Sequence, residues 1–98
     1  MPTKTELEFS DEGVQVGSVF IMNPSVAIRF VEHCQESGIT VFGVEGFLRF
    51  GDQIQPQQEH SCDYESPSDD GHSLTIGFLK DRLETNVWFE VVTDEPAD

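Results

Sequence analysis

The sequence predicts a single small α+β domain, with one mixed sheet of about four strands covered by two helices. Three observations lead to this class. Val-rich strand patterns stand near both ends of the chain, a capped amphipathic helix runs directly into a long apolar stretch, and the chain has 98 residues. That length suits one compact domain and no more. No internal repeat divides residues 1–98 into smaller units.

The first part of the chain alternates between strand-like and helical patterns. Residues 1–12 are polar and acidic, and we expect either a flexible arm or an edge strand there. Residues 13–22 are rich in valine and end in an apolar run, which predicts a buried strand. Residues 23–38 predict a helix, because Asn23 can cap its start and Gly38 is a typical stop residue.

A long strand and a long polar segment follow. Residues 39–50 predict a central strand, in which Gly43 and Gly46 indicate a bend or a close backbone approach. Residues 51–70 are polar, and a loop of 20 residues is unusual in a compact domain and often functional. Part of this loop, around residues 60–64, can pair as an edge strand.

The last part predicts a helix and a strand. The helix is expected to begin near Ser68 and to run to about Glu84. Apolar residues also alternate over 73–79, so a strand there stays open as an alternative. Residues 86–92 predict a closing strand, and residues 93–98 an acidic tail.

Charge is the strongest anomaly of the composition. Nineteen acidic residues against five lysines and arginines give a net charge of −14. Residues 51–98 hold twelve acids and two bases, or −10, and no lysine or arginine lies between Arg49 and Lys80. Such a field attracts cationic partners, so we expect neither direct nucleic-acid binding nor membrane binding. The plain alternative is that the charge serves solubility alone.

The sequence also indicates a compartment. No apolar run approaches the roughly 20 residues of a membrane span. The N-terminus has neither the basic start nor the apolar centre of a secretory signal. Cys34 and Cys62 make no disulfide framework. We therefore expect a cytoplasmic protein with reduced thiols.

The stretch EHSCDYESPSDDGH, residues 59–72, combines two histidines and one cysteine with five carboxylates. A metal site here would use His60, Cys62 and His72. The H-x-C spacing is too tight for the usual zinc ligand pairs, and the regular oxygen spacing of a calcium loop is missing. We expect a solvated loop that holds no metal or other cofactor.

No catalytic pattern stands out, and we expect a protein that is not an enzyme. His33 and Cys34 are neighbours on a predicted helix, so their side chains diverge by about 100° and only Cys34 points to the core. The acidic surroundings of Cys62 disfavour a reactive thiolate. Glu45 stands between glycines in an apolar strand. We expect it on the exposed side of that strand or beside Arg49 rather than in catalysis.

The segments ESGITVFGVEGFLRF, SCDYESPSDD and NVWFEVVTDE, together with the acidity, carry a family resemblance. The chain resembles the small immunity proteins of bacterial toxin–immunity systems, especially those of contact-dependent growth inhibition. The resemblance covers residues 13–95 and rests on general style and short stretches, not on an invariant motif. It implies a cytoplasmic protein that binds one toxin domain tightly and protects the cell that makes it.

Many toxins of such systems are nucleases, whose clefts are cationic. We therefore expect an immunity protein that neutralises a cationic nuclease, and we favour a ribonuclease as this toxin. We expect the immunity protein to be a monomer. Tyr64 is the expected aromatic anchor, whereas Trp88 more simply belongs to the core. The charge and loop pattern predicts that the toxin-binding residues are Asp52, Glu59, Asp63, Tyr64, Glu65, Asp69 and Asp70.

Two alternatives stay open. The first is an acidic nucleic-acid mimic, or an adaptor for another basic protein, and promiscuous binding to basic proteins would support it. The second is a small enzyme or metal-dependent protein built on Glu45 or on the loop that contains His60 and Cys62.

Overall fold

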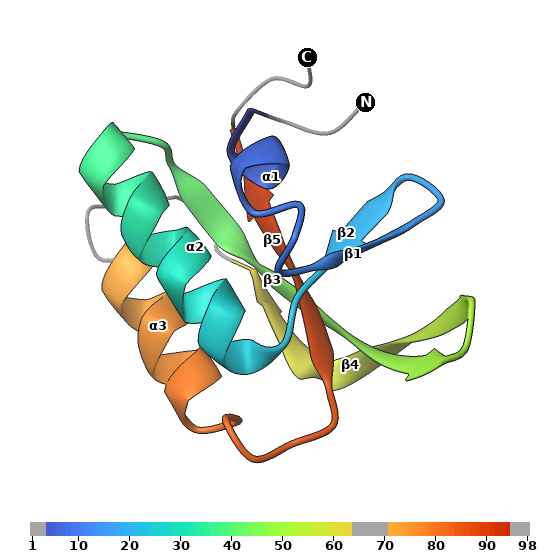
Figure 1. The fold of residues 1–98 in the computed structure, drawn as a ribbon. Helices are drawn as coiled ribbons and strands as arrows, with labels where there is room; N and C mark the ends of the chain where they lie inside the picture. The colour runs from blue at the N-terminus through green and yellow to red at the C-terminus, as the bar shows by residue number, and fades with distance from the viewer. Residues whose placement is uncertain (1–3, 64–70, 95–98) are drawn as a thin grey trace.

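A computed structural model of the chain describes residues 4–63 and 71–94. Within these two ranges it contains three helices and five strands, so the predicted α+β class is confirmed. Figure 1 shows the elements in chain order: α1 (Lys4–Glu8), β1 (Val14–Val16), β2 (Val19–Ile21), α2 (Pro24–Ser37), β3 (Val41–Phe50), β4 (Gln53–Asp63), α3 (Gly71–Lys80) and β5 (Trp88–Thr93).

The described strands divide between two antiparallel sheets. The main sheet has the order β4–β3–β5, and β1 and β2 form a separate hairpin. Met22 and Phe89 join the two: the Met22 amide donates to the Phe89 carbonyl at 2.9 Å, and the Phe89 amide donates back at 2.7 Å. The prediction of one mixed sheet of four strands is therefore wrong in detail. Residues 13–22 do not run as one strand, because the chain turns back at Gly17, whose φ is 60°.

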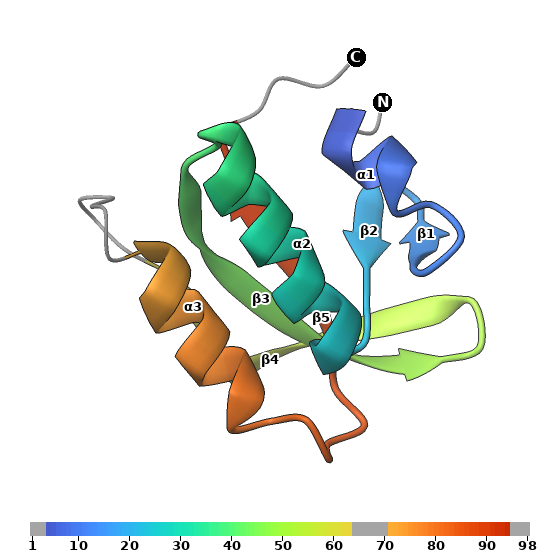
Figure 2. The same cartoon turned by 60° about the vertical axis from the view of Figure 1, so that its left-hand side comes forward.

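The core lies on one face of the main sheet, and α2 and α3 cover this face side by side (Figures 1 and 2). Phe30 of α2, Leu79 of α3 and Phe89 of β5 are almost completely buried there. The rings of Phe78 and Phe89 meet edge to face, with 6.4 Å between their centres. Burial of one such side chain stabilises the fold by about 1.5–3 kcal/mol. The two predicted covering helices are thus present.

The helix α2 follows its sequence pattern closely. The Asn23 side chain accepts a hydrogen bond from the Val26 amide at 3.0 Å, and Gly38 ends the helix with a left-handed φ of 74°. Cys34 is fully buried and His33 is half-exposed, as the helical spacing predicts. His33 also lies 2.9 Å from Glu8 of α1, and Phe9 packs on the ring of Phe30. These contacts hold α1 beside α2.

The polar segment 51–70, predicted as a loop, is a strand over much of its length. β4 pairs with β3 from Gln53 to Asp63, well beyond the short edge pairing expected around 60–64. It is an edge strand, so polar side chains can point away from the sheet on both faces. That polarity hides the two-residue alternation by which strands are usually predicted.

A large bulge interrupts the pairing of β4 with β3. The register passes from Gly46↔Gln57 to Val44↔Cys62, so residues 58–61 stand opposite Glu45 alone. The Ser61 hydroxyl holds the bulge, because it accepts from the Gly46 amide at 3.0 Å and donates to the Gln57 carbonyl at 2.9 Å. A Cβ on Gly46 would lie 2.5 Å from the His60 carbonyl oxygen. The glycine therefore permits the close backbone approach that the sequence indicated.

Three further expectations are decided by the structure. Residues 4–8 form the helix α1, so neither an arm nor an edge strand is correct there. Residues 73–79 are helical, since they lie inside α3. This helix ends at Lys80, earlier than the predicted Glu84, and turns carry the chain on to β5. The expected cap, Ser68, lies outside the described residues.

Candidate functional site

The predicted toxin-binding residues fall into two groups. Asp52 is exposed in the turn between β3 and β4, and Glu59 is exposed in the bulge of β4. Asp63 is the last residue of β4 and pairs with Gly43 of β3. The remaining predicted residues lie outside the described ranges: Tyr64, Glu65, Asp69 and Asp70. The structure therefore places the first three on the β3–β4 hairpin, and about 20 Å of extended strand separates Asp52 from Glu59.

The arginines of the chain contact other groups of the same molecule. Arg29 of α2 forms an ion pair with Glu12. The Arg49 guanidinium lies 5.2 Å from the centre of the Trp88 ring, and its Nε donates to the Gly51 carbonyl at 3.2 Å. The contacts of Arg49 are therefore with Trp88 and Gly51 and not with Glu45, which was an expected partner. Its guanidinium covers the half-buried Trp88 ring. Trp88 alternates with Phe89 on β5, so it lies on the outer face of the sheet and not in the main core.

Arg82 is the most confined of the arginines. Its guanidinium lies 3.6 Å from the centre of the Phe78 ring, and it also donates to the Phe78 carbonyl at 3.0 Å. Its Nε donates to Nδ1 of His60 at 3.1 Å. This contact ties the end of α3 to the bulge of β4.

Both histidines of the 59–72 stretch are thus engaged in structural contacts. His60 accepts from Arg82, and Nε2 of His72 lies 2.7 Å from the carbonyl of Ile39. Cys62 is half-buried and packs against the main core. Across residues 4–63 and 71–94, no group of three or more His, Cys, Asp or Glu side chains is placed to hold a metal ion.

An acidic group that the sequence did not reveal lies on the outer face of the main sheet. Glu45 of β3 and Glu90 of β5 stand directly opposite each other in adjacent antiparallel strands. Such pairs bring Cβ atoms within about 4.5–5.5 Å. Phe89 points to the helices, so the neighbouring Glu90 points away from them. Glu6 of α1 completes a group that we call the outer carboxylates, namely Glu6, Glu45 and Glu90.

The outer carboxylates repel one another. Partial burial, together with the charges of Glu45 and then Glu6, raises the pKa of Glu90 from 4.5 to about 7. Like charges directly opposite across a strand pair destabilise a sheet. The face therefore favours either a proton on Glu90 or a cation supplied from outside.

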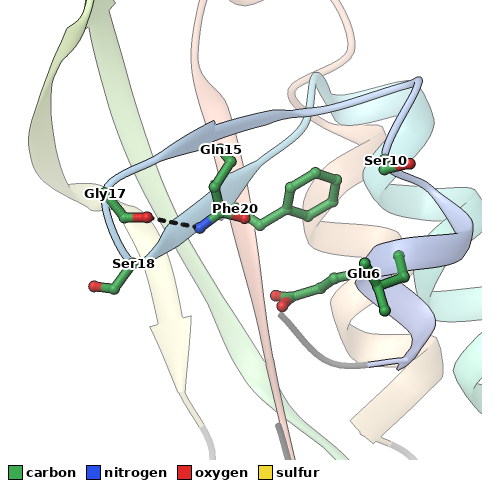
Figure 3. A pocket seen from close by; sticks show the side chains of 7 residues that line it. Glu6, Ser10, Gln15, Gly17, Ser18 and Phe20 are labelled. Carbon is green, nitrogen blue, oxygen red and sulfur yellow. Dashed lines mark hydrogen bonds between the residues drawn. The ribbon is translucent and has the colours of Figure 1, made fainter. Parts of the chain in front are cut away.

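One of the outer carboxylates, Glu6, lines a hollow of about 320 Å³ between α1 and the β1–β2 hairpin. Leu7 of α1, which is 50% exposed, and Phe20 of β2 supply its apolar walls. Figure 3 shows the Phe20 ring and the Glu6 side chain extending from these two elements into the space between them. The polar part of the lining comes from Glu6, Ser10, Gln15 and Ser18, with Gly17 at the turn.

The hairpin shapes this hollow through two local features. Gln15 lies opposite Phe20 in the hairpin, so both side chains leave the same face. Nε2 of Gln15 donates to the Gly17 carbonyl at 3.0 Å and braces the turn. Gly13 makes room for the Phe20 ring, because a Cβ at this position would overlap it.

A second hollow, of about 660 Å³, lies beside the bulge of β4. Pro56, Gln58, Ser61 and Cys62 contribute to its lining. Glu45 thus borders this hollow, while Glu6 borders the first one.

The chain matches no model of a known protein family, and no curated protein shows a similar sequence. Among the described helices, none has the length and apolar character needed to cross a membrane.

Proposed function

We propose that this protein is an immunity protein, which binds and neutralises a cognate cationic toxin domain in the cytoplasm. The toxin is a nuclease, and a ribonuclease is favoured. Inhibition is stoichiometric: the protein occupies the toxin's surface and performs no chemistry on it.

The observation that carries this proposal is the arrangement of charge. The net charge is −14, yet the described arginines are used within the molecule, against Glu12, Trp88, Phe78 and His60. The acidic field is therefore directed at whatever approaches from outside. Exposed acids stand on many elements: Asp11, Glu32, Glu36, Glu45, Asp52, Glu59, Asp81, Glu84 and Asp94.

A nuclease is the partner that this field suits best. Its cleft must be cationic, because it binds the phosphates of its substrate. Charge complementarity raises association rates towards 10⁸–10⁹ M⁻¹s⁻¹ at low salt, about two orders of magnitude or more above neutral pairs. Rapid capture is what a cell needs against a toxin that arrives in few copies.

The first test asks whether the gene directly upstream of this one encodes a toxin domain, and that domain is then produced for the following assays. Co-expression of the two chains should prevent the growth arrest that the toxin domain causes alone, and the purified pair should form a one-to-one complex. Association should slow markedly between 0.05 and 0.5 M salt, as screening predicts. Growth arrest that persists despite good expression of this chain would reject the proposal. Tight binding to several unrelated basic proteins would instead favour an acidic nucleic-acid mimic.

A further inference from the structure

We infer that the hollow between α1 and the β1–β2 hairpin receives one long cationic side chain, a lysine or an arginine, from the bound partner. This inference rests on the proposed function and deepens it, because it assigns a specific contact on a surface that is acidic in many places.

The lining of the hollow matches the two parts of such a side chain. Lysine and arginine bury their methylene stems along apolar surface and keep the charged head near a polar group. Leu7 offers most of the accessible apolar wall, with the edge of the nearly buried Phe20 ring beside it, and the Glu6 side chain extends into the same space (Figure 3). A volume of about 320 Å³ is at the lower end of the range for small-molecule pockets, roughly 300–1,000 Å³. The hollow therefore suits a single side chain better than a whole cofactor.

The charge around the hollow selects the sign of the occupant. Glu6 acts on Glu90, which in turn stands opposite Glu45, so negative charge is concentrated along one side. A cation seated against Glu6 relieves this repulsion and favours loss of the proton from Glu90 near neutral pH. An anionic ligand in the hollow would add to this repulsion and is therefore disfavoured. A second copy of this chain is also disfavoured, because each copy carries −14.

The first experiment probes the hollow without any toxin. The protein labelled with ¹⁵N is titrated at pH 8 with the capped tripeptides Gly-Lys-Gly and Gly-Arg-Gly. A third tripeptide with norleucine keeps the apolar stem but lacks the charge. The two cationic peptides should bind with Kd values of about 1–10 mM, and the amides of α1 and of the hairpin should shift most. The lysine and arginine arms show which head group is preferred.

Matched variants test the two walls. Glu6→Gln should weaken peptide binding about three- to fivefold, and Leu7→Ala should do so by a similar factor. The controls are Glu32→Gln on α2 and Leu74→Ala on α3, where Leu74 is 55% exposed. Both controls remove an equivalent group that does not line the hollow and should change the affinity by less than about twofold.

A third variant tests the hollow without altering the short helix α1. Ser18→Lys introduces a positively charged side chain at the edge of the hollow. This lysine competes with the cationic peptides, so the variant should not bind them. Ser73→Lys makes the same change in net charge at an exposed position of α3 and should leave most of the binding intact. Equal losses in the two lysine variants, or equal binding of the norleucine peptide, would overturn the inference.

The toxin domain separates this inference from the proposed function. If Ser18→Lys weakens toxin binding at least about tenfold more than Ser73→Lys does, the assigned contact and the proposed function are both supported. If the two variants neutralise the toxin equally well, the function stands and the assigned contact is wrong. If the peptides bind as expected but the wild-type protein does not neutralise the toxin, the contact stands and the function is wrong.

Discussion

The two faces of the main sheet differ in how they accommodate charge, although the same strands supply both. On the helix-covered face, Phe89 and Val44 are buried among apolar side chains. On the outer face, Phe47 is buried beside Trp88, but Glu90 stands directly opposite Glu45. The covered face stabilises the fold, whereas the outer face holds like charges close together at a cost in stability. The outer face is therefore the place where a change of charge should alter stability most.

The largest difference between the faces should appear when apolar side chains are shortened. Phe89→Ala removes a fully buried ring and should lower the free energy of unfolding by about 3–5 kcal/mol. Val92→Ala, on the outer face and 37% exposed, should lower it by less than about 1 kcal/mol. Urea denaturation followed by circular dichroism measures both. Similar losses for the two variants would contradict the division between the faces.

The second test concerns the point where the bulge of β4 presses on β3. Gly46→Ala should cost about 2–3 kcal/mol, because the new methyl group would meet the His60 carbonyl and Cβ at 2.5 and 2.7 Å. Gly77→Ala is its control, since nothing lies within 4 Å of a Cβ there and α3 gains a better helix former. This control should be stabilising by about 0.5–1 kcal/mol. Neutral behaviour of Gly46→Ala in denaturation would show that the bulge can move away.

The third test removes the charge conflict on the outer face. Below pH 4.5 Glu90 is protonated in both folded and unfolded chains, so Glu90→Gln should have little effect on stability. As the pH rises from 4.5 to 7, the unfolded chain loses this proton first, and the wild type loses stability relative to the variant. At pH 8 Glu90→Gln should be more stable by about 1–2 kcal/mol, after allowance for solvent screening.

The measurement is thermal or urea unfolding of both proteins at pH 4 and pH 8, with Glu32→Gln as the control. Glu32 is exposed on α2, so its variant should show almost no such dependence on pH. If Glu90→Gln is no more stable than wild type at pH 8, then the outer carboxylates do not oppose one another.

The smallest effect is expected at the predicted toxin-binding residues on the β3–β4 hairpin. Reversal of Asp52 and Glu59 to lysine should slow association with the toxin about 2- to 10-fold, through long-range attraction, and leave unfolding unchanged. Stopped-flow mixing at low and high salt measures this rate. A change confined to dissociation, with no salt dependence, would assign the two residues to direct contacts rather than to attraction at a distance.

The parts of the fold that sequence could predict are those with local signals. The helix α2 carries its cap, its stop and its apolar stripe within 23–38, so both ends and the burial of Cys34 are predictable. The strand β4 carries no such signal. It lies at the edge of the sheet and contains a bulge at residues 58–61, so its sequence shows neither an alternation of polar and apolar residues nor an apolar run. The hairpin β1–β2, by contrast, does carry a local signal, because Gly17-Ser18 is a recognised two-residue hairpin turn between two valine-containing runs.

The candidate site was harder to predict because it depends on contacts distant in sequence. Alternation along β5 would assign Glu90 to the face opposite Phe89, but only the strand register places Glu45 across from it. Glu6 joins them from a helix of five residues, shorter than periodicity can indicate. The acidity of residues 51–98 instead favours a site in the 59–72 stretch. Residues 64–70 of that stretch lie outside the described ranges.

The hollow between α1 and the hairpin is made by one continuous piece of chain. All of its lining residues fall within positions 6–20, before the first long helix begins. Apart from Phe20, these side chains are peripheral to the core that α2, α3 and the main sheet enclose. A lineage can therefore exchange the recognition chemistry of this segment, one side chain at a time, without refolding the domain beneath it. For the immunity function proposed above, contacts that lie in one such stretch can change together with the toxin.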